Sequence, residues 1–261
     1  MRNEAIRLEE QRLQNVNDLS DYQAHHERHR IFPAVFEKRD QTKILDIAAG
    51  VGVVGKRILD HYPADLLCND ICPKCLQTLG KSGLKTVSFD IDDKENDFPF
   101  EDCSFDAVIA LATIEHLINI DHFLGEINRI LRDGGYLYIS APNYAGLTYL
   151  LPFLLSGKTF HDPLTDPSRY EFYAHVRYFT YQTLLEYVSS YNFTADTVYL
   201  PLPESSSRFM SLRKESQMKA ILFRTAMKFI YRLSPRWNAE PVICFQKSVT
   251  KETRNIKTVI M

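Results

Sequence analysis

The fold of this chain is decided by residues 43–56, KILDIAAGVGVVGK. A short apolar run over 44–47 that ends in small residues and glycines predicts a buried parallel strand, a tight turn and then a helix. Gly50, Gly52 and Gly55 have the spacing G-x-G-x-x-G, which brings backbone N–H groups of a helix start toward one ligand. By itself, this spacing is only a weak indication of a dinucleotide site.

Asp46 narrows the choice of ligand. It lies inside the predicted strand, four residues before Gly50, where a carboxylate is costly to bury without a partner. A pyrophosphate would be repelled by that charge. A cation such as S-adenosylmethionine, with its ammonium and sulfonium groups, would be attracted to it.

Residues 45–52, LDIAAGVG, resemble the first motif of class I S-adenosylmethionine-dependent methyltransferases, which usually has glycine where this chain has Ala48. We expect Ala48 to leave room for the ligand with a negative φ. Residues 97–117, DFPFEDCSFDAVIALATIEHL, are similar to the fourth-motif region of the small-molecule members. The resemblance covers roughly residues 40–200 and the final strand. It implies an α/β, Rossmann-like, seven-stranded mixed sheet of order 3-2-1-4-5-7-6, with the last strand antiparallel and helices on both faces.

The composition argues against several other classes of protein. The 261 residues carry a formal net charge of -2, which gives no case for nucleic-acid binding. Five cysteines without a regular framework suggest reduced thiols in a cytoplasmic protein, and the pair Cys72 and Cys75 has no second pair at zinc spacing. The polar first residues do not resemble a signal peptide, and no apolar stretch is long enough to span a membrane.

The chain divides into parts by composition. We expect an N-terminal helical cover over residues 1–40, a methyltransferase domain over 41–248 and a flexible tail over 249–261. Two helical insertions, 144–176 and 203–239, are expected to form the lid or the substrate pocket.

The cofactor residues are predicted from strand ends. Asp70 ends the second predicted strand, 20 residues past Gly50, where a carboxylate reaches ribose hydroxyls; it also suits the cap of the helix that begins near Pro73. The resemblance implies that Asp90 faces the adenine amino group, that Ile91 packs on the ring and that Ala110 lies beside the methionine part. Asp92 is expected in a solvated acidic turn. The predicted cofactor-binding set is Asp46, Ala48, Gly50, Gly52, Asp70, Ile71, Asp90, Ile91 and Ala110.

Three histidines are candidates for a general base: His116, His175 and His161. His116 follows Glu115, and some family members use E-x-x-E-H to hold a metal ion, but Ala112 occupies the first glutamate position here. No metal is therefore predicted. A helix cap remains an alternative role for His116. His175 opens a stretch similar to the family's H-x-R-x-F-T, so it is either an active-site residue or a conformational anchor.

The expected reaction is methyl transfer to an oxygen of a small-molecule, sugar or lipid-linked acceptor, because the insertion 144–176, rich in Tyr and Leu, suits an apolar or ring-bearing acceptor. Residues 204–261 contain twelve Lys or Arg and four acids, and 217–233 form a basic amphipathic helix. That helix either contacts the inner membrane surface peripherally or packs its apolar stripe on its own domain. An NAD(P)-dependent oxidoreductase and a catalytically silent methyltransferase-like binding protein remain alternatives. The sequence does not predict the oligomeric state.

Overall fold

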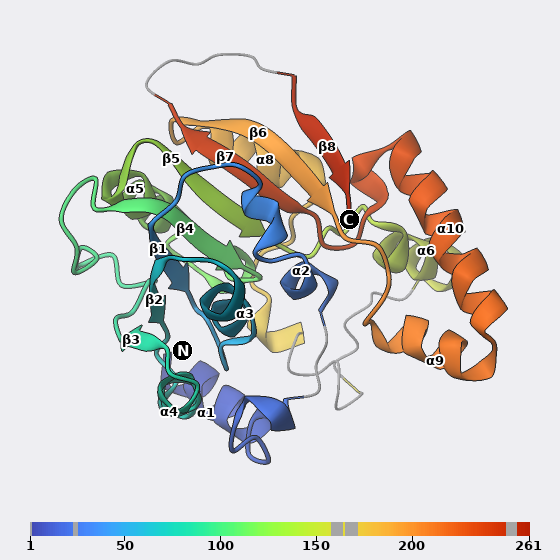
Figure 1. The fold of residues 1–261 in the computed structure, drawn as a ribbon, viewed down its shortest axis with the longest axis horizontal. Coiled ribbons are helices and arrows are strands. Elements are labelled where there is room, and N and C mark those ends of the chain that lie inside the picture. The colour runs from blue at the N-terminus through green and yellow to red at the C-terminus, as the bar shows by residue number, and fades with distance from the viewer. Residues whose placement is uncertain (1, 23–25, 158–163, 165–171, 249–254) are drawn as a thin grey trace.

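One mixed β-sheet runs through the middle of the structure, a computed structural model that describes residues 2–22, 26–157, 164, 172–248 and 255–261 (Figure 1). Eight strands lie in the order β3-β2-β1-β4-β5-β7-β6-β8. Their bounds are β1 Lys43–Ile47, β2 Asp65–Asn69, β3 Lys85–Val87, β4 Phe105–Leu111, β5 Leu131–Ser140, β6 Phe193–Leu200, β7 Val242–Lys247 and β8 Lys257–Ile260.

The predicted order of the first seven strands is confirmed. Strands β1 to β5 are parallel, and β7 is antiparallel to both β5 and β6. The expectation of a flexible tail over 249–261 is wrong for its last residues, because β8 pairs parallel with β6 from Thr197↔Lys257 to Leu200↔Ile260. The backbone of Met261 continues this pairing on Leu200 and Leu202.

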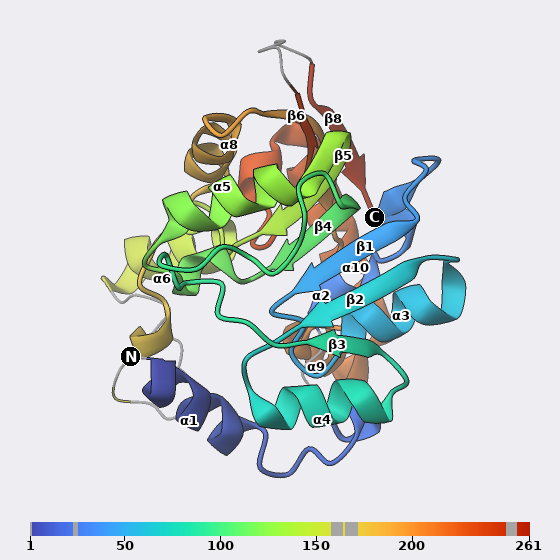
Figure 2. The same cartoon turned by 90° about the vertical axis from the view of Figure 1, so that its left-hand side faces the viewer.

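Helices cover both faces of the sheet. Alternate residues of each strand face opposite sides, so Leu45 and Val108 pack under α5 and α8, whereas Ile44 and Ile109 pack with α3. Figure 2 shows the sheet between α5 on one side and α3 on the other. The helices are α1 Arg2–Arg12, α2 Glu27–Arg30, α3 Val53–His61, α4 Pro73–Lys81, α5 Ile120–Ile130, α6 Leu147–Ser156, α8 Tyr181–Ser189, α9 Ser207–Glu215 and α10 Gln217–Leu233; short 3-10 turns are η1 Leu19–Asp21, η2 Ala34–Phe36, η3 Ile114–His116 and η4 Pro235–Trp237.

The N-terminal segment packs on the sheet and on the glycine turn. Leu13, just after α1, lies in a buried cluster with Val51 of the turn and with Cys72 and Cys75 at the start of α4. These cysteines are therefore packing residues, and both are free thiols. Further along, Phe36 of η2 packs edge-on against Tyr138 of β5.

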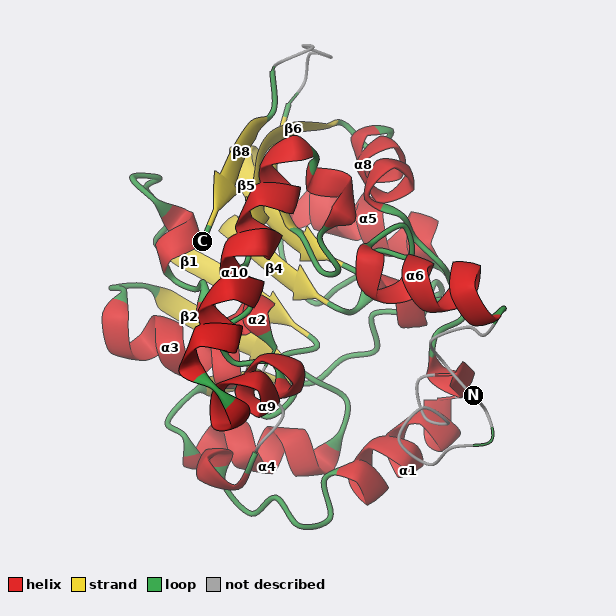
Figure 3. Ribbon diagram, turned by 90° about the vertical axis from the view of Figure 1, so that its right-hand side faces the viewer, coloured by secondary structure: helices red, strands yellow, loops and turns green. Residues whose placement is uncertain are grey.

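The two insertions place helices on one side of the molecule, where α6, α9 and α10 all lie in Figure 3. Helix α10 rests on the domain through Ala220 and Tyr231, which are buried. The interpretation that α10 packs its apolar stripe on the domain is wrong, because Met218, Leu222, Phe229 and Leu233 are 61–70% exposed. No helix among the described residues has the length and hydropathy needed to cross a membrane.

Candidate active site

Asp46 is the most unusual residue at the carboxyl-terminal edge of the sheet, where open α/β sheets bind ligands. Its side chain is 3% exposed, and its Oδ2 atom has no hydrogen-bond partner among the described residues. Burial, with a smaller contribution from the nearby Asp70, raises the pKa of Asp46 to about 8. A buried carboxyl group with a vacant oxygen is a receptor for a cation or for a strong hydrogen-bond donor.

Asp70 ties the glycine turn to the next strand. Its Oδ2 accepts a hydrogen bond from the Gly50 N–H at 2.9 Å, and its Oδ1 accepts one from the Cys72 N–H at 2.8 Å. Burial raises the pKa of Asp70 to about 6, although both bonds act in the opposite direction. The carboxylate thus fixes the turn and the start of α4, and each oxygen retains a second lone pair for a ligand.

The glycines of the turn have different roles. Gly50 has φ 57°, and a Cβ added there would meet nothing within 4 Å, so its face is open to a ligand. Gly52 has φ 90°, and a Cβ there would lie 2.7 Å from Leu79 Cδ2, so this glycine permits close packing of α4. Gly50 thus leaves room for a ligand at the turn that Asp70 holds, and Gly52 lets α4 pack closely against the turn.

The expectation of a negative φ at Ala48 is wrong, because its φ is 51°. The next residue explains the bend: the Ala49 N–H donates to Asn69 O at 2.9 Å, which pulls the chain leaving β1 toward the end of β2. Ala48 therefore adopts the left-handed conformation for which glycine is the usual residue.

The remaining predicted cofactor residues lie at neighbouring strand ends. Ile91 is buried in the core, Ile71 is partly buried, and the Asp90 carboxylate accepts the Asp92 N–H at 3.1 Å. Ala110 is fully buried between β1 and β5. Asp92 is not in a solvated turn as expected: its Oδ1 accepts the N–H groups of Ile118 and Asn119 and so anchors the start of α5.

A second polar cluster follows directly after β4. Glu115 in η3 is 1% exposed, and neither of its carboxylate oxygens has a hydrogen-bond partner among the residues described. Burial raises the pKa of Glu115 to about 8. The rings of His116 and His175 lie 4.8 Å apart, and His116 Nε2 is 4.0 Å from Glu115 Oε1.

Hydrogen bonds orient the two imidazoles. His116 Nδ1 lies 3.0 Å from the carbonyl oxygen of Ala174, which can only accept, so Nδ1 carries a proton, and Nε2 is the basic nitrogen of the neutral ring. His175 Nδ1 lies 3.1 Å from the Tyr144 hydroxyl. The backbone N–H groups of Val176 and Arg177 donate to Glu115 O, which holds these segments together.

Glu115, His116 and His175 each offer an atom within 4.8 Å of the others, a donor set that suits a divalent cation as well as proton transfer. The sequence suggested Glu115 and the two histidines separately but not their meeting, because His175 lies 59 positions beyond His116. The third candidate base, His161, lies outside the described residues.

An ion pair that the sequence did not indicate lies behind this cluster. Arg28 of α2 is 7% exposed and donates to Glu240, 212 positions later in the chain. The Arg28 guanidinium lowers the pKa of Glu240 against the opposing effect of burial. Its charge also acts to lower the pKa of Glu115, where the effect of burial is larger. The N-terminal segment thereby contributes a charge to the site.

Comparisons with known proteins agree with this geometry. A family model described as a methyltransferase domain matches residues 45–139. A malonyl-[acyl-carrier protein] O-methyltransferase of Geobacter sulfurreducens is 31% identical over 112 residues, 41% of each chain. A demethylmenaquinone methyltransferase of Tropheryma whipplei is 29% identical over 140 residues, 50% of this chain and 56% of that protein. The chain thus matches about half the length of these curated relatives.

The fold also matches a solved structure, phosphoethanolamine N-methyltransferase 2 of Haemonchus contortus in complex with S-adenosyl-L-methionine. The TM-score is 0.57 at 16% identity, over 93% of this chain and 56% of that one. This likeness shows the shared fold, and the family model identifies residues 45–139 as part of a methyltransferase domain. The chain therefore carries a class I S-adenosylmethionine-dependent methyltransferase domain.

Proposed function

We propose that this protein transfers a methyl group from S-adenosylmethionine to an oxygen of a small-molecule, sugar or lipid-linked acceptor. The observation that carries the proposal is the buried Asp46 carboxyl group, whose Oδ2 has no hydrogen-bond partner in the described part of the chain, together with the open face of Gly50 in the turn that follows. A second carboxyl group, Asp70, lies close enough to raise the pKa of Asp46. Two acids at the mouth of a glycine turn favour a cationic cofactor over an anionic pyrophosphate.

The residues at this edge fit the cofactor. Asp46 would meet the charged methionine part, Asp70 the ribose hydroxyls, and Asp90 with Ile91 the adenine, while Ala48, Gly50, Gly52, Ile71 and Ala110 shape the site. When bound, S-adenosylmethionine supplies a methyl group that its sulfonium already activates. The protein's main task is then to align the acceptor, and orientation of this kind contributes about 7–11 kcal/mol toward lowering the barrier.

A hydroxyl acceptor must lose a proton, and His116 is the best-supported base. Its Nδ1 donates to Ala174 O, which selects the tautomer in which Nε2 is the basic nitrogen that would take the acceptor's proton. The carboxyl group of Glu115 lies 4.0 Å away, and its ionised form would stabilise the resulting imidazolium. His175, oriented by Tyr144, is the second candidate, and His161 is the third. General base catalysis of this kind contributes typically about 10²–10⁴-fold.

The proposal also assigns a role to each part of the chain. Residues 1–40 would cover the cofactor, and the insertions 144–176 and 203–239 would bind and admit the acceptor within the domain over 41–248. Tyr144, which contacts both His175 and the ring of Tyr149 in α6, connects the first insertion to the candidate base.

Calorimetric titration with S-adenosylmethionine and with NADH separates the proposal from its main rival. We expect binding of the former alone; tight binding of NADH would instead favour an oxidoreductase. Mass spectrometry of ligands that co-purify with the protein tests the same assignment and can identify the acceptor.

Turnover is tested separately. The variant His116→Gln should lower kcat about 10²–10⁴-fold while leaving cofactor affinity unchanged, and the acidic limb of the pH profile should disappear. Bound cofactor without a methylated product across a broad acceptor panel would favour a silent binding protein.

A further inference from the structure

Helix α10 presents an apolar stripe to solvent rather than to the domain. Met218, Leu222, Phe229 and Leu233 are 61–70% exposed. At 3.6 residues per turn these four side chains fall within an arc of about 60°, opposite the buried Ala220 and Tyr231. A soluble domain rarely leaves such a continuous apolar stripe uncovered, so the stripe marks an interaction surface.

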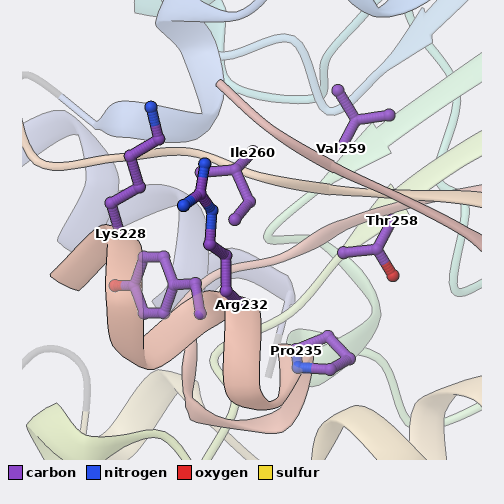
Figure 4. Close-up of a pocket in the computed structure, with 7 residues that line it drawn as sticks. Lys228, Arg232, Pro235, Thr258, Val259 and Ile260 are labelled. Carbon is purple, nitrogen blue, oxygen red and sulfur yellow. The ribbon is translucent and has the colours of Figure 1, made fainter.

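Cations border the stripe. Lys228 and Arg232 follow its edge one turn apart, and neither has a carboxylate within ion-pair distance among the residues that the structure describes. They line a groove of about 550 Å³ between α10 and β8, together with Tyr231 and Thr258 (Figure 4). Figure 4 shows the Lys228 amino group and the Arg232 guanidinium extending in the same direction. Together they form a site suited to a phosphate group.

The charge of this surface indicates what kind of partner it binds. Residues 207–233 carry seven Lys or Arg and one acid, so two copies of this surface would repel each other. An apolar stripe flanked by cations is instead complementary to an anionic lipid bilayer, where the helix lies in the plane of the headgroups.

A second apolar element lies on the same side of the molecule. Helix α6, LTYLLPFLLS, has no charged residue and exposes Leu151, Phe153, Leu154 and Leu155 at 47–84%. Figures 1 and 3 both place α6 on the side of the molecule that carries α10. Tyr149 of α6 packs 4.9 Å from the ring of Tyr144, which in turn contacts His175. The contacts of Tyr144 therefore link α6 to His175, the second candidate base.

We propose that the surface formed by α6, α9 and α10 docks on an anionic membrane, with the stripe of α10 inserted and with Lys228 and Arg232 on lipid phosphates. The docking itself does not depend on the proposed function. That the acceptor is carried by a lipid does rest on it, because α6 leads from the docked surface to His175 and His116.

Vesicle co-sedimentation of the full chain tests the docking. We expect binding to phosphatidylcholine vesicles that contain about 30 mol% phosphatidylglycerol and not to phosphatidylcholine alone. Raising the salt from about 0.1 M to about 1 M should release the protein, since it shortens the screening length from about 10 Å to about 3 Å. Equal binding to neutral vesicles, or none to anionic ones, would overturn the proposal.

Paired variants test the residues. Lys228→Gln with Arg232→Gln should weaken partitioning roughly 25-fold, about fivefold per cation, and Leu222→Ser with Phe229→Ser roughly tenfold or more. The matched controls lie outside this surface: Lys94→Gln, in the loop after β3, and Leu59→Ser, on α3, where 45% of the side chain is exposed. Equal losses in the controls would refute the assignment.

Two further measurements separate the alternatives. Gel filtration should show the same elution for the wild type and for Leu222→Ser with Phe229→Ser; a dimer that this variant dissociates would assign the stripe to a second copy and overturn membrane docking. Calorimetry with S-adenosylmethionine should give unchanged affinity in every docking variant. Vesicle binding without cofactor binding would therefore defeat the proposed function and leave the docking intact.

Discussion

Replacing Ala48 by glycine should stabilise this protein. Ala48 has φ 51°, and a left-handed conformation costs an L-residue roughly 1–2 kcal/mol that glycine does not incur. Glycine also makes the unfolded chain more flexible, which offsets about 0.4–1 kcal/mol of that gain. The difference predicts a net increase of about 0.5–1 kcal/mol in the free energy of unfolding, or a Tm higher by about 1–4 °C for a chain of this size.

Ala49→Gly provides the matched control for this change. Ala49 is absent from the residues of positive φ, so glycine there gains nothing and should destabilise the protein by about 0.4–1 kcal/mol. The two variants remove the same methyl group one position apart. Urea unfolding followed by circular dichroism should therefore separate their stabilities by roughly 1–2 kcal/mol. If Ala48→Gly is no more stable than Ala49→Gly, the left-handed turn before Gly50 is not the conformation in solution.

Two further predictions concern charged groups inside the fold. Arg28→Met removes the buried guanidinium from the partly buried Glu240 carboxylate and should cost about 1–3 kcal/mol of unfolding free energy; Lys85→Met, which breaks an exposed pair, should cost less than about 1 kcal/mol, and equal losses would contradict the ion pair. The pKa of Glu115 is raised by burial to about 8 in the folded state, so its contribution to stability is largest below the unfolded pKa and is lost as the pH rises from about 4.5 to 8. Glu115→Gln should flatten that decline by up to roughly 4 kcal/mol in denaturation curves at several pH values, and an unchanged slope would show that Glu115 is ionised in the fold.

The local features of the fold were predictable because they depend on near neighbours in the sequence. Residues 43–56 predict β1, the turn and α3 from a short apolar run, glycines and helical periodicity. The order of seven strands came from the family resemblance. Strand β8 was missed because Lys257–Ile260 is short and half exposed, and the strand that it pairs with, β6, lies about 60 residues away. Pairing at that distance leaves no local pattern.

The site was predictable only in its parts. Asp46 and Asp70 lie at the ends of β1 and β2, and this position predicts that they face the ligand. The φ of Ala48 was predicted with the wrong sign. It is set by the hydrogen bond from the Ala49 N–H to Asn69 O, and no local sequence pattern indicates this contact between two strand ends. For α10, periodicity identified the apolar stripe through Met218 and Phe229, but periodicity cannot tell which face of a helix meets the domain.

The central claim is that Asp46 receives the positive charge of the cofactor, and proton release on binding tests it most directly. At a pH of about 6.5 the Asp46 carboxyl group, with a pKa of about 8, is protonated, while a free α-amino group keeps its proton. Binding of the cation should ionise Asp46 and release close to one proton, measured by calorimetry in two buffers of different ionisation enthalpy. Asp46→Asn should abolish the release and weaken binding roughly 10–150-fold. No proton release by the wild type, or the same release and affinity in Asp46→Asn, would contradict the account.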